Sequence, residues 1–324
     1  MKKQSYIILG GAGFIGSHFV DYLLDREEAA KLTIYDNFSS GREWHYKRHL
    51  DSPIFKVVKG DIKNLETLKQ TMDTHDVVIH LASNPDIARA ATEPDIDFWE
   101  GTYLTQNVLE AMRVTSAKMI LYASGSGVYG DLGNTEAWED YGPLVPVSTY
   151  GASKLAGEAL IASYCHMFGL QGRAFRFGNV VGPRQTHGVG FDFAKRLLKD
   201  PSVLNILGDG TQSKSYIHVD DIIAAVLLAF RKEQDIFMVY NVATGDYITV
   251  TEIAELVIEI LGLKGRPPQL LYSGGSRGWK GDVPVVRLNT DRIQRLGWIC
   301  SKKTREALYS SISTMAEEIK SGLI

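Results

Sequence analysis

The first half of the chain alternates short, uniformly apolar runs with longer segments in which apolar residues recur every three or four positions. Uniform runs are typical of strands buried on both faces, and the longer spacing is typical of helices that bury one face. The runs predict strands at residues 6–9, 32–35, 54–58, 77–79, 119–122 and 170–177. The periodic segments predict helices at 14–24, 65–72, 96–112 and from Tyr150 onward. This alternation predicts an α/β fold with a parallel, doubly wound sheet.

The second half has a less regular pattern. Helices are predicted at 191–198, 222–230, 288–296 and 304–319, with a strand and turn at 204–210. We expect a first domain at residues 1–180 and a smaller C-terminal α/β lobe at 181–324. The segment near 220–245 is expected to return to the first domain, so the boundary is not clean. A chain of 324 residues is long enough for two lobes.

Three glycines separate the first predicted strand from the first predicted helix. Gly10, Gly13 and Gly16 follow a G-x-x-G-x-x-G spacing. Such a turn lets the backbone approach a pyrophosphate, and the helix N-terminus supplies amide donors. The triplet alone could be a simple tight turn, but the next strand ends in Asp36, at about the distance where an acid meets the adenosine ribose. A carboxylate there repels a 2′-phosphate, so the sequence predicts a dinucleotide site that prefers NAD to NADP.

Tyr150 and Lys154 stand four residues apart at the start of a predicted helix. This spacing is about one helical turn, so the phenol and the ammonium lie on one face. A cation beside a tyrosine lowers the pKa of the phenol, which lets it accept a proton from a hydroxyl near neutral pH. Y-x-x-x-K is a weak motif alone, and the dinucleotide site before it is what favours a catalytic role.

Composition and charge narrow the remaining function classes. The chain is 44% hydrophobic and 23% charged, with a formal net charge of −3. The chain therefore lacks the excess of positive charge that is typical of nucleic-acid-binding proteins. Cys165 and Cys300 lie far apart and in no metal-ligand spacing, so we predict reduced thiols and no metal. The apolar run near the N-terminus is too short for a signal peptide and no run is long enough for a bilayer, so we expect a cytoplasmic protein without a membrane partner.

Several motifs occur in a fixed order along the chain. They are G-G-A-G-F-I-G at 10–16, Asp36-Asn37, Gly60-Asp61, His80-Leu81-Ala82, V-Y-G at 128–130 and the Tyr150–Lys154 pair. Together they resemble the extended short-chain dehydrogenases/reductases of the NAD-dependent sugar-nucleotide epimerase/dehydratase family. Within it, the chain is most similar to the prokaryotic UDP-glucose 4-epimerases. The resemblance covers nearly the whole chain and implies a Rossmann domain followed by a nucleotide-sugar-binding lobe that closes over the substrate.

The resemblance implies oxidation at sugar C4. Tyr150 would accept the 4-hydroxyl proton as a phenolate while hydride passes to NAD, and Lys154 would keep Tyr150 acidic. A Ser or Thr of the family falls here on Gly125. Ser126 is therefore the first candidate for the hydroxyl partner and Ser124 the second, and it remains open that neither contacts substrate.

The resemblance also implies the residues that bind the two ligands. For NAD these are Gly10, Gly13, Phe14, Ile15, Gly16, Asp36, Asn37, Ser40, Gly41, Asp61, Ile62, Leu81, Ala82, Ser83, Tyr150, Lys154 and Phe177. For the nucleotide sugar they are Ser126, Tyr150, Asn179, Lys214, Arg277, Lys280 and Asp282.

Some of these assignments have alternatives. Asp61 could face adenine or cap the following helix, and Asn179 could simply form a turn. Lys214 stands where the family usually has Arg, and either Arg277 or Lys280 could meet the diphosphate.

The reaction type follows from what precedes V-Y-G. Related dehydratases carry an Asp-Glu pair there, whereas this chain has Ser126-Gly127. Elimination then lacks an acid and a base, which favours C4 epimerisation of UDP-glucose and UDP-galactose with tightly bound NAD. The alternatives are 4-epimerisation of another nucleotide sugar such as UDP-GlcNAc or UDP-glucuronate, a 4,6-dehydratase, or a non-enzymatic NAD sensor. Carboxylates at 136, 139 and 140 could fold back into the site, which would weaken this argument. Relatives commonly form homodimers through the helices at 96–112 and 150–166.

Overall fold

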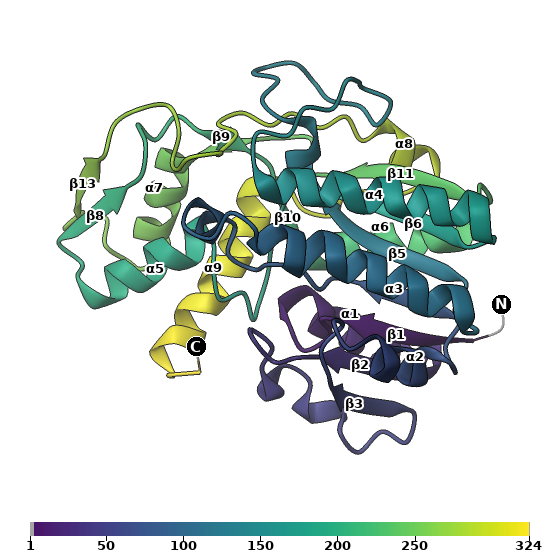
Figure 1. Cartoon of the computed structure of the whole chain (residues 1–324). Coiled ribbons are helices and arrows are strands. Elements are labelled where there is room, and N and C mark those ends of the chain that lie inside the picture. The colour runs from purple at the N-terminus through teal and green to yellow at the C-terminus, as the bar shows by residue number, and fades with distance from the viewer. Residues whose placement is uncertain (1–2, 324) are drawn as a thin grey trace. The chain divides into compact units, whose positions relative to one another are not determined.

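The computed structural model describes residues 3–323, which form two compact units (Figure 1). The first unit comprises the described residues up to Val128, together with Thr149–Arg176 and Ile223–Tyr240. The second comprises Tyr129–Ser148, Phe177–Ile222 and the described residues from Asn241 onward. The segment Tyr129–Ser148 therefore belongs to the second unit, although the predicted boundary at residue 180 assigned it to the first domain.

The first unit is built on a seven-stranded sheet in the order β11-β6-β5-β4-β1-β2-β3. Its strands are β1 (Gln4–Leu9), β2 (Ala29–Asp36), β3 (Phe55–Lys59), β4 (Val77–His80), β5 (Met119–Gly125), β6 (Gln171–Phe177) and β11 (Phe237–Val242). The pairs from β3 through β5 are parallel. The order 3-2-1-4-5-6 is that of the classical dinucleotide-binding sheet, so the predicted fold class is confirmed.

Both faces of this sheet are buried, as uniformly apolar strands require. Ile7 and Leu9 of β1 belong to one core cluster, which α2 (Leu65–Met72), α3 (Tyr103–Val114) and α4 (Thr149–Phe168) complete. Tyr6 points to the other face, where its ring contacts Phe230 of α6 (Val219–Lys232). Helix α1 (Phe14–Asp25) follows β1 directly. The chain therefore winds helices onto both sides of the sheet.

One predicted helix differs in detail. The segment 96–112 is not a single α-helix, because a π-helical turn, η4 (Phe98–Thr102), precedes α3. Gly101 lies in this turn against α4, where an added Cβ would come within 2.1 Å of the Ser153 hydroxyl. Close approach of the two helices therefore requires glycine at this position.

The second unit packs three helices around its own core. These are α5 (Val189–Lys199), α7 (Val250–Ile260) and α9 (Thr304–Lys320), and their buried residues include Phe191, Ile253 and Leu308. Short sheets join β7 (Asn179–Val181) to β10 (Tyr216–His218), β8 (Val203–Ile206) to β13 (Gln269–Tyr272), and β9 (Ser213–Lys214) to β12 (Ile248–Thr249). The helix predicted at 288–296 is shorter, since α8 covers only Asp291–Arg295.

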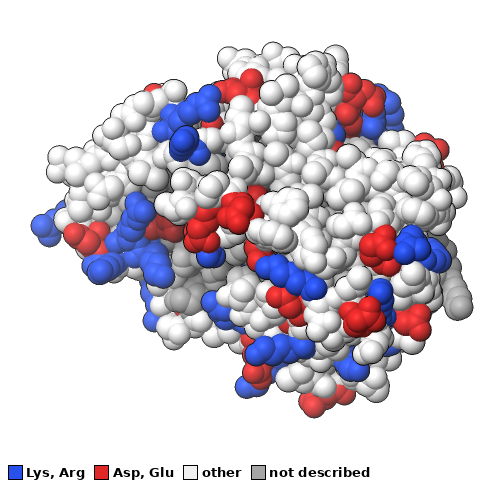
Figure 2. Space-filling model, in the orientation of Figure 1, with Lys and Arg blue, Asp and Glu red and all other residues white. Residues whose placement is uncertain are grey.

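The remaining short turns are 3-10 helices. They are η1 (Glu43–His45), η2 (Lys47–His49), η3 (Ile87–Ala91) and η5 (Ser126–Tyr129). None of the helices within residues 3–323 is both long and apolar enough to cross a membrane. On the face drawn in Figure 2, acidic and basic side chains occur together in small groups rather than as one extended field of a single sign.

Candidate active site

The glycine turn between β1 and α1 packs tightly on its inner side. Gly10 has a positive φ of 80°, and a Cβ there would lie 2.9 Å from the backbone nitrogen of Ala82. A Cβ at Gly16 would lie 2.5 Å from the Gly10 carbonyl oxygen. These two glycines are therefore required by the close approach of backbone segments.

The outer side of the same turn is more open. A Cβ at Gly13 would meet only the Gly10 carbonyl oxygen, at 3.3 Å. No side chain caps α1, which begins at Phe14 and Ile15. A phosphate group placed at this end of α1 would meet the first-turn amides and the positive end of the helix dipole.

Asp36 at the end of β2 lies against this turn. Its Oδ2 accepts a hydrogen bond from the Ala12 amide at 2.9 Å, and its Oδ1 accepts one from Phe38 at 2.8 Å. Burial is the main cause that raises the pKa of Asp36, and the two backbone donors oppose it. A Cβ at Gly41 would lie 3.0 Å from the Asp36 carboxylate, so the loop also closes tightly over the acid. Asn37 and Ser40, which follow Asp36 in the chain, are both exposed.

The strand ends next to β1 supply the other predicted cofactor residues. The Asp61 carboxylate accepts from the Lys63 amide at 2.9 Å, whereas Asn64 caps α2. The alternative in which Asp61 caps the helix is therefore wrong. The Ile62 side chain is part of the core, which leaves only its backbone for a ligand. After β4, Leu81, Ala82 and Ser83 are partly exposed, and Phe177 is a buried residue that ends β6.

Tyr150 and Lys154 lie on the first turns of α4, as their spacing predicts. The Lys154 Nζ atom is 5.4 Å from the centroid of the Tyr150 ring and 5.2 Å from that of Tyr122. It donates a hydrogen bond to the Ala123 carbonyl oxygen at 2.8 Å. The Tyr150 hydroxyl forms a hydrogen bond with Ser83. The phenol, the ammonium and the end of β5 therefore lie together.

Burial has a large effect on the pKa values of this pair. Burial raises the pKa of Tyr150 to about 12, with the Ser83 hydrogen bond lowering it and the Asp97 charge raising it further. Burial also lowers the pKa of Lys154 to about 8. Burial is the largest influence on both pKa values, and the stabilisation of the Tyr150 phenolate by the Lys154 cation stays a prediction.

The two candidate serines have different surroundings. Ser124 is buried and donates to Glu158 at 2.5 Å, and Glu158 forms a buried ion pair with Arg176 at 2.7 Å. Its hydroxyl is therefore committed to the core. Ser126 is partly exposed, and its hydroxyl has no hydrogen-bond partner among residues 3–323. A Cβ at Gly125 would meet nothing within 4 Å, so there is open space beside Ser126.

Sequence reasoning missed Asp97. This carboxylate is 2% exposed, and it raises the pKa of both Tyr150 and Lys154. It accepts hydrogen bonds from Asn84 at 2.9 Å and from Thr149 at 2.7 Å. Asp97 falls inside the helix predicted at 96–112, where an Asp is usually exposed, and no local pattern signals that this one is buried.

The second unit brings most predicted substrate residues together. Lys214 forms an ion pair with buried Asp282 at 2.6 Å. Arg277 donates to the Asp282 carbonyl oxygen at 2.9 Å and pairs with Asp131 at 2.7 Å. Asp282 thus fixes both cations through internal contacts. Lys280 is exposed and has no partner among the described residues.

Asn179 is the first residue of β7, which pairs with β10. Its amide donates to the Ser215 carbonyl oxygen at 3.2 Å. Its exposed side chain forms no hydrogen bond within the described part of the chain, so the side-chain amide is available to a ligand.

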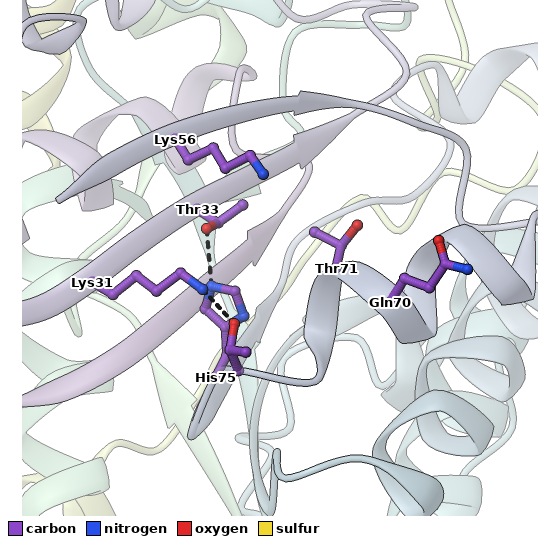
Figure 3. Close-up of a pocket in the computed structure, with 7 residues that line it drawn as sticks. Lys31, Thr33, Lys56, Gln70, Thr71 and His75 are labelled. Atoms are coloured by element: carbon purple, nitrogen blue, oxygen red, sulfur yellow. Dashed lines mark hydrogen bonds between the residues drawn. The ribbon is translucent and has the colours of Figure 1, made fainter. Parts of the chain in front are cut away.

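A polar cavity of ≈280 Å³ lies elsewhere in the first unit (Figure 3). It is lined by Lys31, Thr33, Lys56, Gln70, Thr71, Thr74 and His75. His75 contacts the Thr33 hydroxyl at 2.9 Å, while Asp36 lies three residues farther along β2. The cavity contains none of the predicted site residues, so it is separate from the candidate active site.

The chain is similar in sequence and in fold to known proteins. Residues 6–243 match the family model described as the NAD dependent epimerase/dehydratase family. The chain is 30% identical to a UDP-glucose 4-epimerase of Mycolicibacterium smegmatis, over 90% of this chain and 92% of the relative. A crystal structure of a UDP-galactose 4-epimerase is 36% identical with a TM-score of 0.86, over 97% of this chain and 99% of that chain. The UDP-glucose 4-epimerase of Thermus thermophilus, solved as a complex with NAD, is 28% identical with a TM-score of 0.84, over 96% of this chain and 98% of that chain.

Proposed function

Because the chain belongs to the NAD-dependent epimerase/dehydratase family, we propose that it is a 4-epimerase that interconverts UDP-glucose and UDP-galactose. Membership makes it an NAD-dependent enzyme that modifies nucleotide sugars. The family includes both epimerases and dehydratases, so the reaction has to be argued from the residues of the site.

The residues of the first unit fit NAD and supply acid–base chemistry. The open side of Gly13 and the uncapped α1 would hold the pyrophosphate, and Asp36 would accept from the ribose hydroxyls. NAD held by these residues would supply reversible hydride transfer at sugar C4. Tyr150 would take the proton of the 4-hydroxyl, with Lys154 as the neighbouring cation. Ser126 would bind the same hydroxyl, because its Oγ is uncommitted whereas that of Ser124 is not.

One observation favours epimerisation over dehydration. Removal of the C6 hydroxyl as water needs an acid and a base beside the sugar, but Ser126 and Gly127 carry no carboxylate. The carboxylates farther along the chain have partners within the second unit. Glu139 accepts from the Asn241 amide at 2.8 Å, and Asp140 pairs with Arg292 at 2.5 Å. These contacts support the view that Glu139 and Asp140 are not the acid and base of a dehydration reaction.

The cations of the second unit would bind the substrate diphosphate. We propose Arg277 rather than Lys280 for this contact, because Arg277 and Lys214 are both fixed by Asp282. Asp282 would then position the cations and would not contact the diphosphate, since two anions repel. Asn179 would add a neutral amide donor from β7.

A panel of nucleotide sugars tests the proposal. Purified protein is incubated with UDP-, dTDP-, GDP- and CDP-hexoses, UDP-GlcNAc and UDP-glucuronate, and the products are separated by anion-exchange chromatography. We expect turnover of UDP-galactose to UDP-glucose, with Tyr150→Phe as the inactive control. Turnover of a different nucleotide sugar only would show that UDP-galactose and UDP-glucose are not the substrates. A product that has lost water would refute epimerisation.

We also propose that the protein is a homodimer that pairs through η4, α3 and α4. Trp99 is 46% exposed and Met167 is 72% exposed on these elements, which leaves apolar area uncovered. A Trp99→Glu, Met167→Glu double variant should sediment as a monomer while the parent sediments as a dimer. A monomeric parent would contradict the proposal.

A further inference from the structure

Asp97 is the one buried carboxylate near Tyr150 that is not in an ion pair among the described residues. It directly precedes η4, yet its side chain does not cap that helix. Burial of an uncompensated charge is costly, so such a group persists where hydrogen bonds stabilise it. Its two oxygens accept from side chains that belong to different segments of the first unit.

These two donors flank the hydroxyl pair of the site. Thr149, which donates to Oδ2 at 2.7 Å, immediately precedes Tyr150. Asn84, which donates to Oδ1 at 2.9 Å, immediately follows Ser83. Asn84 is itself fixed, because its side chain both donates to and accepts from the backbone of Asp86. Asp97 thus ties the start of α4 to the loop after β4, on either side of the Ser83–Tyr150 hydrogen bond.

The other titratable groups nearby are neutral or compensated. His80 on β4 is buried, and burial lowers its pKa to about 3. Burial raises the pKa of Tyr122 on β5, so it stays protonated. Glu158 on α4 is neutralised by Arg176 on β6. Asp97 is therefore the carboxylate whose charge acts on both Tyr150 and Lys154.

We propose that Asp97 is a positioning residue, which aligns Tyr150 with Ser83 and keeps Lys154 cationic. This inference rests on the proposed role of Tyr150 as base. The carboxylate does two things at once. Its hydrogen bonds set the geometry of the hydroxyl pair, and its charge favours the ammonium of Lys154 while disfavouring the phenolate of Tyr150.

Asp97→Asn tests the charge with little change in shape. Both Tyr150 and Lys154 should then titrate at lower pH, because the negative charge that raises both pKa values is gone. Activity requires a phenolate and an ammonium, so both limbs of the kcat–pH profile should move toward lower pH. In the NAD-bound protein, the difference in phenolate absorbance between Asp97→Asn and Asp97→Asn, Tyr150→Phe gives the same shift for Tyr150 directly.

Thr149 offers a matched pair that leaves the charge in place. Thr149→Val removes the hydrogen bond to Asp97, and we expect kcat to fall about tenfold to a hundredfold with the pH profile unmoved. Thr149→Ser keeps the hydroxyl and should retain parental kcat. If Asp97→Asn does not fold, this pair alone decides the positioning role.

The outcomes separate this inference from the proposed function. An unshifted Tyr150 titration in Asp97→Asn, or parental kcat in Thr149→Val, would overturn the role of Asp97. The phenolate titration does not depend on which sugar is turned over, so it remains decisive even where UDP-galactose is not a substrate.

Discussion

At the scale of single residues, the pKa of Tyr150 poses the main physical question. Burial is the main cause that raises it to about 12. Oxidised NAD carries a positive nicotinamide ring, so NAD binding should lower the pKa of Tyr150. We expect the phenolate absorbance to appear at lower pH in the NAD-bound protein than in the apo-protein, with Tyr150→Phe subtracted as the blank. Coincident titrations would show that the cofactor does not control the base.

The role of Tyr150 as base predicts a separation of binding from turnover. Tyr150→Phe removes the proton acceptor, so kcat should fall about 10²–10⁴-fold. NAD binding should change little, because Asp36 and the glycine turn are untouched. Lys154→Met should also lower kcat, since the neighbouring cation is lost. Near-parental rates in Tyr150→Phe would show that another group takes the proton.

Asp36 predicts the choice between the two dinucleotides. Its carboxylate lies against the glycine turn and would repel a 2′-phosphate, so the apo-protein should bind NAD more tightly than NADP. Isothermal titration of both cofactors measures this preference. Equal affinities would remove Asp36 from the cofactor site.

At the scale of elements, Gly13 and Gly16 at the start of α1 are expected to contribute differently, one to NAD binding and the other to stability. Gly16→Ala should lower the free energy of unfolding by about 1–3 kcal/mol, because its Cβ would overlap the Gly10 carbonyl oxygen. Gly13→Ala has an ordinary φ of −77° and its Cβ would lie 3.3 Å from the Gly10 carbonyl oxygen, so it should cost less stability than Gly16→Ala. Its methyl group would instead occupy the pyrophosphate side and raise the Kd for NAD. Denaturant unfolding and NAD titration of both variants distinguish these effects.

Elements with a strong local pattern were predictable from the sequence. Helix α2 has the predicted bounds, Leu65–Met72, and the uniformly apolar strands of the sheet are all present. Helix α7 was not predicted, although Thr249 and Glu252 form a capping box at its start. The π-helical turn before α3 has no periodic signal of its own, because it depends on packing of Gly101 against α4.

The positions of site residues were predictable where a sequence motif determines them. They were not predictable where tertiary packing determines them. The spacing of Tyr150 and Lys154 correctly placed both on one face of α4. Burial decides the pKa of Tyr150, the commitment of Ser124 to Glu158 and the position of Asp97, and no short motif encodes burial. Physical reasoning from sequence therefore found the pair that the structure brings together on α4 but not the buried charges around it.

At the scale of the whole molecule, the central claim is that hydride leaves C4 of a UDP-hexose and returns to C4. The direct measurement is proton NMR of the product formed from UDP-galactose that carries deuterium at C4. We predict UDP-glucose with the deuterium retained at C4, because the site supplies a base for the 4-hydroxyl and no carboxylate at Ser126–Gly127 for elimination. A 6-deoxy-4-keto sugar with deuterium at C6 would contradict the account.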